Sequence, residues 1–178
     1  MEYGEISQFL KRVVGALGRC VLLAVALPLV PVLIFNLPLA PALALITSGF
    51  MIEYGAAPIG IALRLPPLFV FYVLMCTETG IFLGLFDIFD TIGSASVPVT
   101  RFLEMTQQLA RRSKVMERYG IYGLIPCEIL IGVYFCAPVS RVMGWREYPA
   151  LTITIAGYCV ALIVTILATL GIIRFLRL

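Results

Sequence analysis

The chain has 178 residues, of which 61% are hydrophobic and 13% are charged, and its formal net charge is +3. This composition is far more apolar than that of a soluble domain, so it excludes a water-soluble globular protein and predicts an all-α, polytopic transmembrane helical bundle, at ~20 residues per span. The chain has no histidine and no Gly-rich phosphate loop, which excludes His-based catalysis, His-ligated metals and P-loop ATPases. We therefore expect a single integral membrane domain over residues 1–178 with no enzyme activity, no metal and no cofactor.

The N-terminal region combines an amphipathic segment with an apolar run. Apolar side chains recur at helical spacing in residues 1–18, which predicts a helix lying in the membrane interface. The run from Cys20 to Phe35 predicts the first span, kinked at Pro28 and Pro31. A basic start before an apolar run is also typical of a signal peptide, and that alternative stays open.

Residues 39–67 are apolar but interrupted. The run from Leu39 stops at Glu53-Tyr54-Gly55-Ala56-Ala57-Pro58, and a second short run carries Arg64 and ends at Pro66-Pro67. Such broken pairs predict a re-entrant hairpin, because irregular backbone is tolerated at membrane depth only where protein or a water-filled cavity covers it. Leu68 to Phe89 then predicts a full span.

The centre of the chain is polar and basic. Residues 97–119 predict an amphipathic helix on the cytoplasmic surface, where its positive charges meet anionic lipid. The stretch also carries Glu104 and Glu117 and lacks interleaved aromatic residues, which argues against nucleic-acid binding.

The second half of the chain, like the first, contains an interrupted apolar run followed by a long one. Gly120 to Met143 is broken, and Tyr148 to Ile173 predicts the last span. With the basic centre inside, one re-entrant element and one span precede it and another such pair follows in the opposite direction. This inverted repeat is typical of secondary transporters, whose site lies where the broken helices meet, although it leaves Arg174 and Arg177 outside against the positive-inside tendency. The residues expected to break the helices are Gly55, Pro58, Gly60, Pro126, Gly132 and Pro138.

Five charged residues lie in segments that hydropathy assigns to the membrane, namely Glu53, Glu78, Glu128, Arg64 and Arg141. An ionised side chain at mid-bilayer costs about 2.5–3.5 kcal/mol, so these groups must pair, bind protons or face a hydrated cavity. Each outcome suits a pathway for protons or charged solutes. The alternative is a structural role as the ion pairs Glu53–Arg64 and Glu128–Arg141, or snorkelling to the interface.

Glu78 gives the strongest of these indications. It lies about halfway along an uninterrupted apolar span, so it should face the bundle interior, where desolvation favours the protonated carboxyl unless a cation pairs with it. We assign no role to Asp87 and Asp90 at the end of this span. Six aromatic residues are interpreted as interface anchors or packing residues, with the lining of a solute pathway as the alternative: Tyr54, Tyr72, Tyr122, Tyr134, Trp145 and Tyr148.

Two motifs stand out: Glu53-x-Gly55-Ala56-x-Pro58-x-Gly60, and Ala110-Arg111-Arg112-Ser113-Lys114-x3-Arg118-Tyr119-Gly120 followed by Gly123-Leu124. They resemble the first signature and the basic central helix of the small multi-drug export protein family, an archaeal and bacterial membrane family, over roughly residues 45–173. The second broken segment differs, since only Pro126 and Gly132 of the family's pattern remain there. Through its similarity to DedA-type lipid translocases, the family implies proton coupling and an amphiphilic or lipid substrate.

The sequence thus predicts a multi-pass protein of the cell membrane that exports an amphiphilic small molecule or translocates a lipid, coupled to protons. Its partners would be the bilayer and the amphiphile. The alternative is a non-catalytic subunit of a larger membrane complex, whose intramembrane polar residues bind helices of a different protein or of a second copy.

Overall fold

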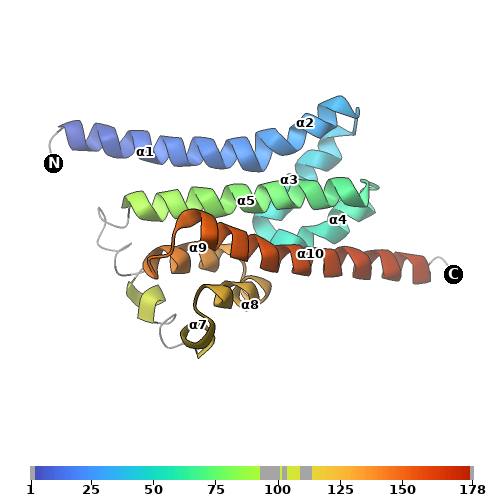
Figure 1. Cartoon of the computed structure of the whole chain (residues 1–178). Coiled ribbons are helices and arrows are strands. Elements are labelled where there is room, and N and C mark those ends of the chain that lie inside the picture. The colour runs from blue at the N-terminus through green and yellow to red at the C-terminus, as the bar shows by residue number, and fades with distance from the viewer. Residues whose placement is uncertain (1–2, 93–100, 102–103, 109–113, 177–178) are drawn as a thin grey trace.

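The computed structural model describes residues 3–92, 101, 104–108 and 114–176. These residues form helices joined by short turns, so the predicted all-α fold is confirmed (Figure 1). By length and composition, four stretches of the described chain can cross a membrane: Leu10–Ile34, Leu39–Ala62, Pro67–Thr91 and Glu147–Ile172. The chain is therefore built as an integral membrane protein.

The first stretch is one continuous helical rod. Helix α1 (Tyr3–Val21) passes through a π-helical turn (Leu22–Ala26) into α2 (Leu27–Ile34) without leaving the helical conformation. The helix therefore continues past residue 18, and the interfacial position of residues 1–18 stays a prediction. The wide π turn lies directly before Pro28, whose ring removes one backbone donor from the helix.

The second stretch is a hairpin and not a straight span. Helix α3 (Leu39–Ile52) ends in a 3₁₀ turn (Glu53–Ala56), and α4 (Ala57–Ala62) follows, as the sequence predicted. A Cβ atom placed on Gly60 would lie 3.0 Å from Leu45 Cδ1, whereas fifteen residues of straight helix would separate them by about 22 Å. Helix α4 therefore folds back along α3 before α5 (Pro67–Ile92) crosses the bundle.

The second half contains a matching hairpin. Helix α7 (Lys114–Tyr119) leads through a 3₁₀ turn (Gly120–Gly123) into α8 (Leu124–Leu130), and α9 (Val133–Val142) precedes the long α10 (Glu147–Leu176). The thiol of Cys136 on α9 lies 3.9 Å from the carbonyl of Leu124, so α8 and α9 lie side by side. The predicted interruption between Gly120 and Met143 is confirmed.

Helices α4 and α9 end in the same turn, 80 residues apart. Arg64 and Gly144 take the left-handed conformation, with φ of +63° and +73°. The next amide, of Leu65 or Trp145, donates to the carbonyl five residues earlier at 3.1 or 3.0 Å, which is a Schellman cap. Helices α5 and α10 then run in opposite directions (Figure 1), as the predicted inverted repeat requires.

The basic helix expected over residues 97–119 falls mostly on residues outside the described part of the chain. Of the described ones, Arg101 and residues 104–108 are helical, and α7 begins at Lys114. One continuous helix over this range stays a prediction.

Candidate functional site

Three glutamates from separate parts of the chain meet inside the bundle. Glu53 lies in the break of the first hairpin, Glu78 lies midway along α5, and Glu128 lies in α8. Their exposed fractions are 9%, 1% and 0%. Glu78 is within electrostatic range of both of the others and is the immediate neighbour of Glu128. The structure thus brings together all three glutamates that the sequence placed in the candidate pathway.

Glu53 joins the tips of the two hairpins. Its Oε1 accepts a hydrogen bond from the backbone amide of Val133, at 3.1 Å, so the carboxylate caps the N-terminus of α9. A negative group is favoured there because the first amides of a helix have no carbonyl partner and carry the positive end of the helix dipole. Gly132 makes the approach feasible, since a Cβ atom there would lie 2.3 Å from both carboxylate oxygens.

Two tyrosines tie the same hairpins together in a reciprocal way. The Tyr54 hydroxyl donates to the carbonyl of Ile129 at 2.9 Å, and the Tyr134 hydroxyl donates to the carbonyl of Phe50. Each tyrosine thus satisfies a carbonyl at the end of the first helix of the other hairpin. The interpretation of these tyrosines as interface anchors missed this pairing. The available signal was the motif Tyr-x-x-Ala-Pro, which occurs at residues 54–58 and again at 134–138.

Removing either tyrosine hydroxyl is expected to loosen the hairpin junction. Tyr54→Phe and Tyr134→Phe should each lower the free energy of unfolding by about 1 kcal/mol, because a helix-end carbonyl then loses its donor. Tyr148→Phe is the matched control, since Tyr148 is exposed at the start of α10. Thermal unfolding in detergent would measure all three. Equal stability of Tyr134→Phe and Tyr148→Phe would contradict the reciprocal arrangement.

The carboxyl cluster has no compensating cation among the described residues. Both side-chain oxygens of Glu128 and Oε1 of Glu78 are buried without a hydrogen-bond partner there. An ionised carboxylate buried without a partner costs several kcal/mol. The cluster therefore has to take up protons or a ligand cation to be neutral. No group of three or more Cys, Asp or Glu side chains in the described chain is arranged to hold a metal ion.

The two candidate arginines lie away from the cluster. Arg64 is exposed in the turn after α4, and Arg141 forms an ion pair with Asp90 at the end of α5. The alternative pairs Glu53–Arg64 and Glu128–Arg141 are therefore not formed.

Other charges hold one end of the bundle together. Arg19 of α1 binds Asp87 of α5 at 3.2 Å and Glu147 of α10 at 2.8 Å. With the pair between Arg141 and Asp90, these contacts connect α1, α5, α9 and α10. The two aspartates to which the sequence gave no role thus carry the ion pairs of α5.

The helix-breaking residues have distinct structural tasks. Gly55 lies within the first 3₁₀ turn, and Pro58 lies in the first turn of α4, where a missing backbone donor costs nothing. Pro126 occupies the equivalent first turn of α8. Pro138 lies inside α9 and leaves the carbonyl four residues earlier without its helical donor. Only Gly60 and Gly132 of this set make close approaches that a side chain would prevent.

No family model matches the chain, and neither does any curated protein or solved structure. The resemblance of residues 53–60 to the small multi-drug export protein family therefore stays an expectation from the sequence. The function has to be argued from the cluster and its surroundings.

Proposed function

We propose that this protein is a proton-coupled carrier that exports an amphiphilic small molecule or translocates a lipid across the cell membrane. The observation that carries the proposal is the cluster of Glu53, Glu78 and Glu128 at the junction of two broken hairpins. Buried acidic groups at membrane depth are a recurring element of proton relays in pumps and transporters. Their position where discontinuous helices meet is the usual position of a transporter site.

The cluster supports proton coupling because its three carboxyl groups become neutral only when they bind protons. Glu78 and Glu128 are nearly inaccessible, and the ion pairs of the described residues involve other acidic groups. Three neighbouring carboxylates cannot all be ionised in a desolvated site, since like charges repel most strongly where the dielectric is low. A proton gained on one side of the membrane and released on the other would provide the coupling.

The junction also supports a change of conformation. The two hairpin tips are joined by few polar contacts, namely the Glu53 cap and the bonds of Tyr54 and Tyr134. Glu53 has a φ of +50°, which is uncommon for a residue other than glycine. Movement of one hairpin relative to the other would expose the cluster to alternate sides, as in carriers built from inverted repeats.

The charge distribution supports an orientation. Helices α1 and α10 begin where α5 ends (Figure 1), and this end of the described chain carries Lys11, Arg12, Arg19, Arg141 and Arg146. Basic residues beside spans are retained in the cytoplasm, so this end would face inside. The turn with Arg64, at the opposite end of α5, would then face outside.

Reconstituted vesicles test the proposal. The purified protein is placed in vesicles that contain a pH-sensitive dye, and ethidium or NBD-labelled phosphatidylglycerol is followed together with the internal pH. We expect the wild type to move one of the probes with protons and Glu78→Gln to lose the proton movement. Glu117→Gln, an exposed residue of α7, is the control. A Glu78→Gln protein that moves probe and protons as well as the wild type would refute the coupling.

A second outcome would favour the alternative function. If the purified chain moves neither probe and a different membrane protein co-purifies with it stoichiometrically in mild detergent, the chain is a subunit of a larger complex. The polar residues of the hairpins would then serve assembly.

A further inference from the structure

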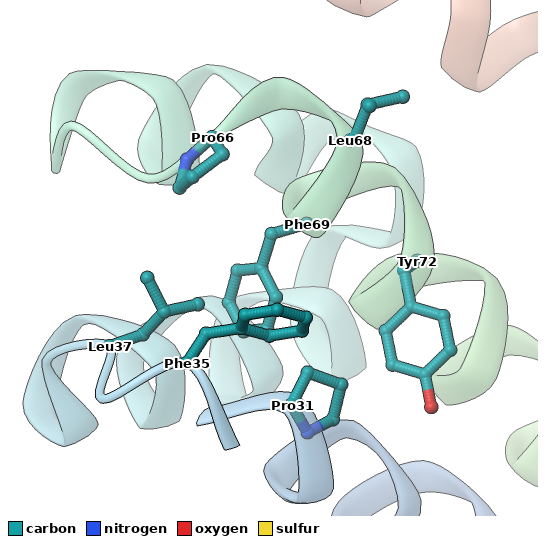
Figure 2. A pocket seen from close by; sticks show the side chains of 7 residues that line it. All are labelled: Pro31, Phe35, Leu37, Pro66, Leu68, Phe69 and Tyr72. Carbon is teal, nitrogen blue, oxygen red and sulfur yellow. The ribbon is translucent and has the colours of Figure 1, made fainter. Parts of the chain in front are cut away.

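An apolar groove lies at the end of the bundle opposite to the ion pairs. It has a volume of about 490 Å³ and is formed by the end of α2 and the start of α5 (Figure 2). The residues that line it are Pro31, Phe35, Leu37, Pro66, Leu68, Phe69 and Tyr72. The only polar side-chain group among them, the Tyr72 hydroxyl, already donates to the carbonyl of Leu27 at 3.2 Å. The groove therefore offers apolar contact to its occupant.

The position of the groove places it at the boundary of the hydrocarbon core. Helix α2 ends at Ile34 and α5 begins at Pro67, so the groove lies where two spans meet the interface. Leu68 and Phe35 are 84% and 71% exposed at its edge. Since this surface faces lipid in an embedded protein, the molecule nearest to the groove is a lipid chain.

Arg64 is the basic residue next to the groove along the chain. It precedes Pro66 by two residues, so their Cα atoms are at most about 7 Å apart. The residue is exposed, and none of the ion pairs of the described residues includes it. A guanidinium at the interface without an acidic partner is suited to bind a phosphate group, which accepts two parallel hydrogen bonds from it.

The backbone of Arg64 indicates that its side chain serves a purpose. Its φ of +63° is unfavourable for a residue with a Cβ atom, and the equivalent turn of the other half has Gly144 at this position. Glycine would form this turn without strain. A strained residue that persists where glycine would be easier is an indication of function.

We infer that the groove and Arg64 form a binding site for an anionic phospholipid, with an acyl chain in the groove and the phosphate at Arg64. The charge of Arg64 favours an anionic over a zwitterionic lipid. The site goes beyond the proposed transport activity and does not depend on it, because it requires only that the chain lies in a membrane.

Fluorescence quenching by brominated lipids tests the site. Leu68→Trp provides a reporter at the exposed edge of the groove, in a Trp145→Phe background that removes the only native tryptophan. Vesicles of phosphatidylcholine contain brominated phosphatidylglycerol or brominated phosphatidylcholine at equal fractions. We expect the brominated phosphatidylglycerol to bind about fivefold tighter, as one arginine beside an anionic lipid would produce.

Two substitutions of Arg64 and one control position make the test decisive. Arg64→Gly keeps the left-handed turn and removes the charge, so it should fold and lose the preference, whereas Arg64→Lys should retain part of it. Leu167→Trp on α10 reports on ordinary lipid contact, since Leu167 is 63% exposed, and should show no preference. Equal quenching by both lipids at Leu68→Trp, or a preference that persists in Arg64→Gly, would overturn the inference.

Discussion

Gly132→Ala is expected to destabilise the protein strongly, because this glycine has both a close neighbour and a backbone conformation that a Cβ atom disfavours. The new Cβ atom would lie 2.3 Å from both oxygens of Glu53, so the Glu53 side chain has to move away and the hydrogen bond with which it caps α9 is lost. In addition, Gly132 has φ of +96° and ψ of 178°, a region that is essentially restricted to glycine. Strain of about 1–3 kcal/mol and the loss of a helix cap of about 1 kcal/mol add to a loss of about 2–4 kcal/mol.

Two further variants separate these contributions. Gly15→Ala in α1 has no neighbouring atom within 4 Å of the new Cβ, so it should be neutral or slightly stabilising. Adding Glu53→Ala to Gly132→Ala removes the collision but not the backbone strain, and should recover part of the stability. Unfolding in detergent micelles measures all variants. If Gly132→Ala and Gly15→Ala unfold at the same temperature, the close contact between Gly132 and Glu53 does not exist in the protein.

Glu128→Met is expected to stabilise the fold and to abolish proton coupling. Glu128 is fully buried, and no ion pair of the described residues includes it; the polar groups beside its carboxyl are those of Glu78 and Cys136. Methionine has a similar volume and no polar atom to desolvate, and replacing buried charged groups by apolar ones of similar size often stabilises a protein by about 1–4 kcal/mol. Residues that serve function often lower the free energy of unfolding, so a stabilising substitution at Glu128 would agree with a functional role.

The measurement pairs stability with transport. Glu128→Met should unfold at a higher temperature than the wild type in detergent and should give no coupled proton movement in vesicles. Glu117→Met, an exposed residue of α7, should change neither property. A Glu128→Met protein that is less stable than the wild type would show that the carboxyl holds the hairpins together, and the cluster would then be structural.

The two hairpins could be predicted because their breaks are local. At the first break a glutamate, a glycine and a proline fall together between Glu53 and Pro58, so the end of α3 there followed from the sequence. The burial of Glu78 followed from its place in a long apolar span. That Glu53, Glu78 and Glu128 meet could not be predicted, because it depends on how the hairpins pack against α5.

The roles of the arginines could not be obtained from hydropathy. A hydropathy average over neighbouring residues places Arg64 and Arg141 within the membrane, as it does the glutamates. In the structure α4 and α9 are short, so both arginines lie at the ends of the hairpins. There Arg141 forms an ion pair with Asp90, which belongs to the separate apolar stretch of α5. The continuity of the N-terminal helix could not be predicted, because the amphipathic pattern ends near residue 18 whereas the backbone continues through a π turn.

The length of α10 has a consequence for the outer surface. With 30 residues it measures about 45 Å, half as long again as a hydrocarbon core of about 30 Å. Because Arg19 binds Glu147 at the end that the proposed orientation places inside, the surplus would emerge on the far side unless the helix tilts strongly. The backbone of residue 174 lies about 40 Å along the helix from Glu147, beyond a hydrocarbon core of about 30 Å. In the proposed orientation, the last turns of α10 would therefore extend past the lipid chains on the outer side.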